Sequence, residues 1–136
     1  MIFIDTGALI ALSDRKDQYH INATVTYTRL KLLRERILTT DYIIDETVTR
    51  LRYDLNHLTA IKFLDFIERA EKTGVIIIEK IDEIIFQEAK SIFRKYDSTV
   101  FSFTDCTSFA VCKIKKIFEA FAFDQHFTMM GINLLS

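Results

Sequence analysis

The hydrophobic positions of this 136-residue chain follow two patterns, and the first is a short run in which nearly every position is apolar. Such runs, bounded by turn or helix-start residues, are typical of strands that are covered on both faces of a sheet. They predict four strands and one edge strand, at residues 1–4, 37–39, 75–78, 118–123 and 132–134.

The second pattern places apolar residues three and four positions apart, which indicates amphipathic helices between the strands. Asp41 fits an N-cap, and Gly74 fits the residue that ends a helix. The predicted helices span residues 6–13, 19–36, 58–72, 82–96 and 105–116, and a further helix follows the Asp41 cap and carries apolar positions up to Leu51. Strand–helix alternation with right-handed crossovers predicts an α/β fold, a three-layer α/β/α sandwich with a mostly parallel central sheet.

Four carboxylates, Asp5, Glu46, Asp105 and Asp124, stand at or just past points where an apolar run gives way to a helix-start or turn signal. The carboxyl ends of adjacent parallel strands converge on one crevice, so acids that are distant in sequence can become neighbours there. Asp5 and Asp124 follow predicted strands, and Glu46 lies one turn into a helix. Asp105 opens a helix that no clear strand precedes, so only the tertiary fold can bring it to the others.

Clustered carboxylates suit a hard cation, because Mg²⁺ and Mn²⁺ prefer oxygen ligands. A cation so held can activate water and stabilise charge on a phosphodiester, so the implied reaction is metal-assisted phosphodiester hydrolysis. Each acid also has a structural alternative. Asp5 can end a strand, Asp124 can belong to a turn, and residues Ser102 to Asp105 fit a capping box. The capping role of Asp105 is compatible with metal binding.

Length and composition predict a single domain over residues 1–136, since 49% hydrophobic residues suffice for a core of this size. The apolar runs are far shorter than a membrane span, so we expect no membrane partner and a cytoplasmic location. Cys106 and Cys112 lie six positions apart in one predicted helix, too far to form a disulfide, and we expect reduced thiols.

A formal net charge of −1 does not by itself favour a nucleic-acid-binding protein, but a nuclease needs only a local basic rim. Arg50, one turn beyond Glu46, is the best candidate for a substrate contact, although an i,i+4 ion pair between the two explains it almost as well. His126 follows Asp124 by two residues. It can contact substrate or hydrogen-bond its own loop, and we favour the loop.

Four phrases together resemble the PIN-domain ribonucleases, and in particular the VapC-type toxins of prokaryotic toxin–antitoxin pairs and their stand-alone relatives. The resemblance covers essentially the whole chain, in order and with suitable spacing. The phrases are Phe3-Ile4-Asp5-Thr6-Gly7-Ala8, Thr39-Thr40-Asp41-Tyr42-Ile43-Ile44-Asp45-Glu46-Thr47, Ser102-Phe103-Thr104-Asp105-Cys106-Thr107-Ser108-Phe109 and Ala122-Phe123-Asp124-Gln125-His126-Phe127.

The resemblance implies a Mg²⁺- or Mn²⁺-dependent endoribonuclease, the toxin of a type II pair, with RNA as substrate, a possible antitoxin partner and a homodimeric state. Residue by residue, the positions that match the family's acids are Asp5, Glu46, Asp105 and Asp124. Thr6 and Thr104 match hydroxyl positions that help to orient metal-bound water or a ligand carboxylate.

Three alternatives share this fold: a stand-alone nuclease in RNA processing, a nuclease of structured DNA, and an RNA-binding domain that no longer cuts. A phosphatase of the haloacid-dehalogenase type would need a second Asp where Gly7 stands, so the sequence argues against that class.

Overall fold

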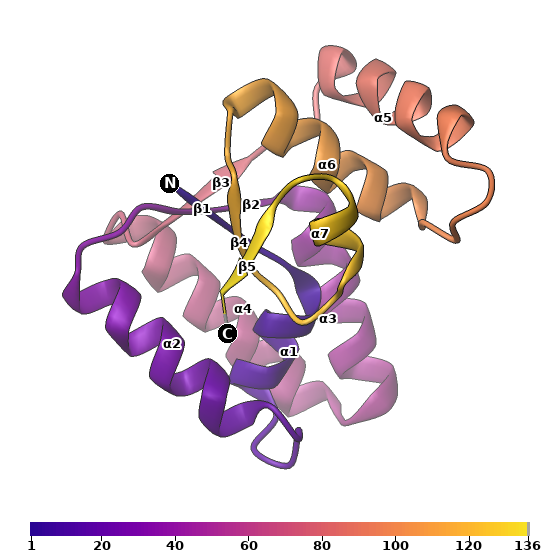
Figure 1. Ribbon diagram of the computed structural model, residues 1–136. Coiled ribbons are helices and arrows are strands. Elements are labelled where there is room, and N and C mark those ends of the chain that lie inside the picture. The colour runs from indigo at the N-terminus through magenta and orange to yellow at the C-terminus, as the bar shows by residue number, and fades with distance from the viewer. Residues whose placement is uncertain (136) are drawn as a thin grey trace.

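The computed structural model describes residues 1–135, which fold around a five-stranded sheet with the strand order β3-β2-β1-β4-β5 (Figure 1). Every pairing in the sheet is parallel. The strands are β1 (Ile2–Ile4), β2 (Ile37–Thr40), β3 (Ile76–Glu79), β4 (Glu119–Phe121) and β5 (Asn133–Leu135). The predicted α/β architecture is therefore confirmed. Most observed strand ends differ from the predicted ends by one or two residues.

The helices alternate with the strands, as the pattern predicts. They are α1 (Thr6–Ser13), α2 (His20–Leu32), α3 (Asp41–Asp54), α4 (His57–Lys72), α5 (Glu83–Lys95), α6 (Phe103–Lys115) and α7 (His126–Met129). None of the helices within residues 1–135 combines the length and apolar character that a bilayer crossing requires.

The chain adds strands on one side of β1 first and on the other side afterwards, and this change of direction assigns the helices to two faces of the sheet. The chain moves outward from β1 through β2 to β3, and then returns past β1 to β4 and β5. Because parallel crossovers are right-handed, α1 to α4 cover one face and α5 to α7 cover the other. The two groups lie on opposite sides of the sheet in Figure 1. The switch point, where such folds form a crevice, lies between β1 and β4.

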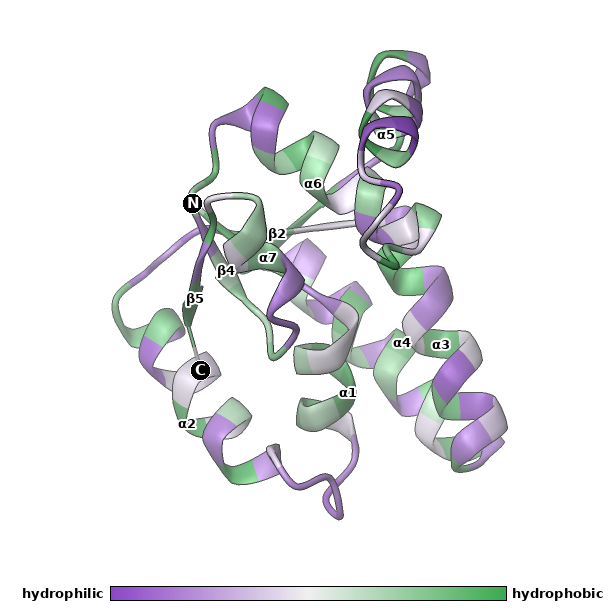
Figure 2. Cartoon of the chain, turned by 45° about the vertical axis from the view of Figure 1, so that its right-hand side comes forward, coloured by the Kyte–Doolittle hydropathy of each residue, from purple (hydrophilic) through white to green (hydrophobic). Residues whose placement is uncertain are grey.

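The core explains why the strand-forming runs are nearly all apolar. The central strands β1 and β2 are buried at every position, whereas the edge strands β3 and β5 are partly exposed. Figure 2 shows hydrophobic residues concentrated on the sheet and on the inner sides of the helices. Cys106 and Cys112 are buried free thiols on α6, as their spacing predicts.

Helix ends account for most corrections to the predicted elements. Thr40, not Asp41, is the N-cap of α3, because its hydroxyl accepts a hydrogen bond from the Ile43 N–H. Helix α2 ends at Leu32 instead of residue 36, since Arg34 adopts a left-handed φ of 55° that no α-helix continues through. Gly74, with a φ of 76°, follows the C-cap of α4 as predicted.

Two further differences concern the C-terminal half. Helix α6 begins at Phe103, two residues before the predicted start at Asp105, because Ser102 caps it. Helix α7 was not predicted, since its four residues are too few to show a helical period.

Candidate active site

Two of the four acids follow the two strands that flank the switch point. Asp5 comes directly after β1, and Asp124 lies three residues beyond the end of β4. The strands are in register, with Ile4 opposite Phe121, and the Asp5 N–H donates to the Phe121 carbonyl oxygen at 3.1 Å. The parallel pairing therefore delivers Asp5 and the loop that carries Asp124 to one edge of the sheet.

Asp5 occupies the N-cap position of α1 but does not cap the helix with its side chain. Its backbone carbonyl accepts from the Leu9 N–H at 3.1 Å, so the main chain alone starts the helix. The residue is only 7% exposed. Apart from the Thr6 N–H, which lowers its pKa, this buried carboxylate keeps acceptor capacity for another partner.

Asp105 serves two roles, as the sequence allows. It forms a capping box with Ser102: the Asp105 N–H donates to Ser102 Oγ at 2.9 Å, and the Ser102 N–H donates to Asp105 Oδ2 at 3.0 Å. The cap fixes the rotamer of Asp105 while its Oδ1 stays free of the capping interaction. The sequence predicts helix α6 but not its position relative to the other acids. In the structure α6 packs against α5 and contacts α3.

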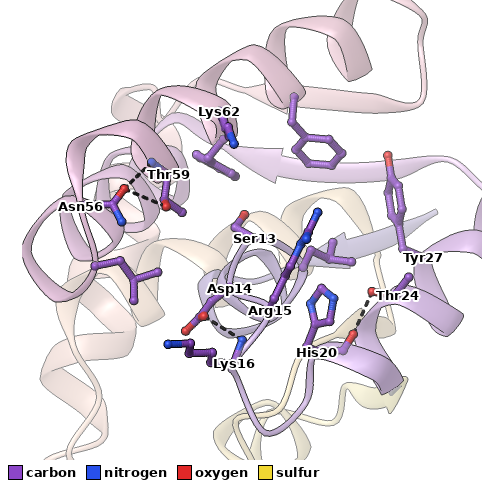
Figure 3. Close-up of a pocket in the computed structure, with 14 residues that line it drawn as sticks. Ser13, Asp14, Arg15, Lys16, His20, Thr24, Tyr27, Asn56, Thr59 and Lys62 are labelled. Carbon is purple, nitrogen blue, oxygen red and sulfur yellow. Dashed lines mark hydrogen bonds between the residues drawn. The ribbon is translucent and has the colours of Figure 1, made fainter.

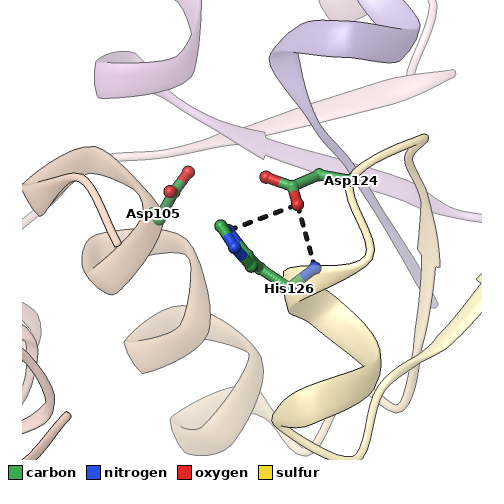
Figure 4. Close-up of side chains that lie close together, drawn as sticks. All are labelled: Asp105, Asp124 and His126. Atoms are coloured by element: carbon green, nitrogen blue, oxygen red, sulfur yellow. Dashed lines mark hydrogen bonds and ion pairs between the residues drawn. The ribbon is translucent and has the colours of Figure 1, made fainter. Parts of the chain in front are cut away.

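A compact group is formed by Asp105, Asp124 and His126, which offer one ligand atom each within 4.8 Å of one another (Figure 4). The backbone N–H of His126 donates to Asp124 Oδ1 at 2.9 Å, so the main chain orders the loop, whereas the ring makes no hydrogen bond to it. Its ring Nδ1 also lies 3.3 Å from the same oxygen, close enough for electrostatic attraction although the angle does not make a hydrogen bond. The ring of His126 thus joins the acids, which the sequence did not predict.

Glu46 approaches from α3, which contacts both α1 and α6. It is half-buried, whereas its neighbour Asp45 is exposed, so the helix turns Glu46 toward the protein as predicted. Arg50 is exposed, and within residues 1–135 no ion pair joins it to Glu46. The ion-pair explanation of Arg50 is therefore wrong, and its charge is free for another partner.

Electrostatics tie the four acids into one neighbourhood. Burial raises the pKa of Asp5 from 3.8 to about 7, and the charges of Asp105, Glu46 and Asp124 contribute to the rise, against a lowering by the Thr6 N–H. Burial also raises the pKa of Asp105, and the Asp124 charge adds to it, while hydrogen bonds from Ser102 oppose the shift. The site favours a proton or a cation over bare negative charge.

Hydroxyl groups accompany the acids on α1 and α6. The Thr6 and Ser108 hydroxyls are buried and find no hydrogen-bond partner within the described chain. Thr104 is half-buried beside Asp105 and uses its carbonyl oxygen to accept from the Thr107 hydroxyl at 2.6 Å. Carboxylate oxygens, one imidazole nitrogen and an unsatisfied hydroxyl form a donor set that fits a divalent cation such as Mg²⁺ or Mn²⁺.

A separate groove lies away from the acids. A cavity of about 850 Å³ opens between the end of α1, α2 and α4, and its lining includes none of the four acids (Figure 3). Arg15, Lys16 and Lys62 line it together with one carboxylate, Asp14, and mostly uncharged side chains. A cationic groove of this kind has no carboxylate cluster to hold a metal, so the acid group at the switch point is the stronger candidate for chemistry.

Comparison with known proteins places nearly the whole chain in one protein family. The family profile described as PIN domain matches residues 2–132. The 23S rRNA-specific endonuclease VapC20 of Mycobacterium tuberculosis (strain ATCC 25618 / H37Rv) is 28% identical over 96% of this chain and 95% of its own. A VapC ribonuclease of Archaeoglobus fulgidus is 31% identical over 95% of this chain and 80% of its own.

Solved structures agree with the fold. The crystal structure of M. tuberculosis VapC20, described as a sarcin–ricin loop cleaving toxin, aligns with a TM-score of 0.84 at 28% identity, over 97% of this chain and 96% of that one. FitAcB from Neisseria gonorrhoeae aligns with a TM-score of 0.63 at 14% identity, over 100% of this chain and 97% of that one, a likeness of fold alone.

Proposed function

This chain belongs to the PIN-domain family, and we propose that it is a metal-dependent endoribonuclease that acts as the toxin of a type II toxin–antitoxin pair. The observation that carries the proposal is the convergence of Asp5, Asp105 and Asp124 at the switch point, with Glu46 close enough for its charge to raise the pKa of Asp5. Similarity to a VapC ribonuclease at 31% identity supports the reaction class.

Each of the site residues has a proposed role in binding the cation or in orienting its ligands. Asp105 and Asp124 would hold Mg²⁺ or Mn²⁺ with Asp5 and Glu46, and the bound cation would supply an activated water and charge stabilisation at the phosphate. Thr6, beside Asp5, and Thr104, beside Asp105, would orient a ligand carboxylate or a water.

Asp5 is the acid whose protonation state would depend on a bound cation. With a pKa of about 7, its carboxyl group holds a proton for much of the time near neutral pH, and it would release that proton on becoming a ligand. The capping box holds Asp105 in one orientation throughout, so Asp105 is preorganised for the cation.

The substrate we propose is RNA, with a structured ribosomal RNA loop as the first to test. VapC20 is named for cleaving 23S rRNA, and its similarity covers 96% of this chain. Arg50 would contact a substrate phosphate, because it is exposed, one helical turn from Glu46, and not paired to it.

Partners and setting follow from the same family. We propose an antitoxin that restrains the nuclease, a homodimeric state, a cytoplasmic location and a single domain over residues 1–136. A stand-alone role in RNA processing, cleavage of structured DNA, and RNA binding without cleavage are the outcomes that would replace this proposal.

The deciding experiment incubates the purified chain with intact ribosomes, free ribosomal RNA and a structured DNA hairpin, in Mn²⁺ or in EDTA, and maps new ends by primer extension. The proposal expects metal-dependent cuts at defined RNA positions and none in DNA. Cleavage confined to DNA, cleavage that EDTA leaves intact, or RNA binding without cuts would each contradict it.

A further inference from the structure

An aromatic cluster borders the acid site on the α5–α6 hairpin. Phe103 is the first residue of α6, two positions before Asp105. Its ring centroid lies 5.1 Å from that of Phe86 and 6.0 Å from that of Phe93, both on α5. Because residues two apart on a helix are separated by about 200°, Phe103 and Asp105 project from different sides of α6, and the cluster lies about one helix diameter, roughly 10 Å, from the acids. A few nucleotides of extended RNA span that distance.

Phe93 presents a free ring face to solvent. It is 51% exposed and meets Phe103 edge-on at 61°, which leaves a face of the ring open. The aromatic pair on the other side of the site differs, because Tyr19 and Phe123 stack face to face at 4.3 Å and 8° and so cover each other. Of these two pairs, the one on the α5 side therefore offers the uncovered ring face.

Unpaired cations accompany the exposed ring. Arg94 and Lys95 follow Phe93 directly, and Lys90 lies one turn earlier with its Nζ 5.2 Å from the Phe86 ring centroid. Within residues 1–135, no carboxylate lies at ion-pair distance from Lys90, Arg94 or Lys95. On the same hairpin Glu88 is paired with Lys113 at 2.6 Å, and the three cations outnumber the exposed Asp97, so the net charge at this end of α5 is positive.

We propose that Phe93, Phe103, Lys90 and Arg94 form a stacking platform that holds an unpaired RNA nucleobase, and its phosphates, a few nucleotides from the bond that the acid site cuts. The inference rests on the proposed nuclease function and names how substrate is positioned. Aromatic faces next to cations are the combination that binds single-stranded nucleic acid, since rings take bases and cations take phosphates. A second copy of this chain fits less well, because two-fold pairing of this surface would bring like charges together.

The test measures binding of an unpaired RNA of about 12 nucleotides that carries 2-aminopurine, and of the same RNA with abasic sites, to the full chain with Asp124→Asn to prevent cleavage. In that background Phe93→Leu removes the ring at similar volume, Phe93→Tyr restores a ring, and Phe118→Leu is the matched control. Phe118 is 65% exposed and precedes β4, at the opposite edge of the sheet from the acids.

Phe93→Leu is expected to weaken binding of the base-containing RNA about tenfold, with less quenching of 2-aminopurine, and to leave the abasic RNA unchanged. Phe93→Tyr and Phe118→Leu are expected to bind like the parent. Arg94→Ala is expected to lower the slope of log affinity against log salt by about 1 for both RNAs, and Arg69→Ala on α4 to leave it unchanged.

Three results overturn the platform. The first is that Phe93→Leu binds the base-containing RNA as tightly as Phe118→Leu does. The second is that Phe93→Leu loses equal affinity for the base-containing and the abasic RNA. Neither result is compatible with stacking of a base on Phe93. The third is a dimer that Phe93→Leu splits in sedimentation, with RNA affinity per protomer unchanged, which assigns the surface to a second copy. If the platform fails but the unsubstituted chain still cleaves RNA in the presence of metal, only the platform is wrong. If the unsubstituted chain neither cleaves nor binds RNA, the nuclease function is contradicted as well.

Discussion

Replacing Asp5 by Asn should stabilise the metal-free protein, and the gain should grow with pH. The native carboxyl group has a pKa of about 7, against 3.8 in the unfolded reference. Between these values the native state holds a proton that the unfolded state has released, so the stability of the metal-free protein falls as pH rises through this window. The side-chain amide of the Asp5→Asn variant does not titrate, so the stability of the variant lacks this decline.

The magnitude follows from the shift. A difference of about 3 pKa units corresponds to about 4 kcal/mol, which is the upper limit of the gain for a carboxylate that is only 7% exposed. The gain should be near zero at about pH 4, increase to about pH 7, and stay constant above that pH. At the full value the melting temperature of a chain of this size would rise by roughly 10 °C.

Urea unfolding followed by far-ultraviolet circular dichroism is a suitable assay, because the chain contains no tryptophan. The measured quantity is the difference in unfolding free energy between variant and wild type at each pH, in EDTA. Asp45→Asn is the matched control, since Asp45 is an exposed carboxylate next to Glu46. Equal, pH-independent differences for Asp5→Asn and Asp45→Asn would refute the reasoning.

A bound cation should reverse the order, because stabilisation grows as RT ln(1 + [L]/Kd) and Asp5→Asn removes a proposed ligand. Saturating Mn²⁺ should raise the melting temperature of the wild type more than that of the variant. An equal rise in both proteins would separate Asp5 from the metal site.

Three further predictions address other parts of the account. Mn²⁺ binding should release close to one proton at about pH 6 and almost none at about pH 8.5, measured by titration calorimetry in buffers of different ionisation enthalpy; release that does not vary with pH would contradict the raised pKa of Asp5. Ser102→Ala should lower the unfolding free energy by about 1 kcal/mol in urea, because it removes the cap of α6, and an unchanged value would deny the capping box a role in stability. Arg50→Ala should make the salt dependence of RNA affinity shallower by about 1 in log–log slope, whereas an unchanged slope would exclude a phosphate contact.

The sequence predicted the fold through features that are local. The apolar run before Asp5 indicated a strand covered on both faces, as β1 is, and the alternation of strands with helices leaves few topologies. The positions of Asp5 and Asp124 followed from the same argument, since parallel strands bring their carboxyl ends together.

The remaining features depend on packing that no local pattern encodes. Asp105 reaches the site because α6 packs on α5 and also touches α3, a helix that is distant in sequence. The ring of His126 joins Asp105 and Asp124 through the four-residue α7, which is too short to give a periodic signal. Helix α2 stops early because of one backbone angle at Arg34, and the residue type does not demand that angle.

The central claim is that the acids at the switch point form one metal-dependent nuclease site. The most direct measurement compares RNA cleavage rates of the wild type, Asp105→Asn and Asp45→Asn, purified identically, in Mn²⁺ and in EDTA. The account predicts that Asp105→Asn loses about 100-fold or more, that Asp45→Asn cleaves like the wild type, and that EDTA abolishes all cleavage. Cleavage by Asp105→Asn at the wild-type rate, with EDTA inert, would contradict it.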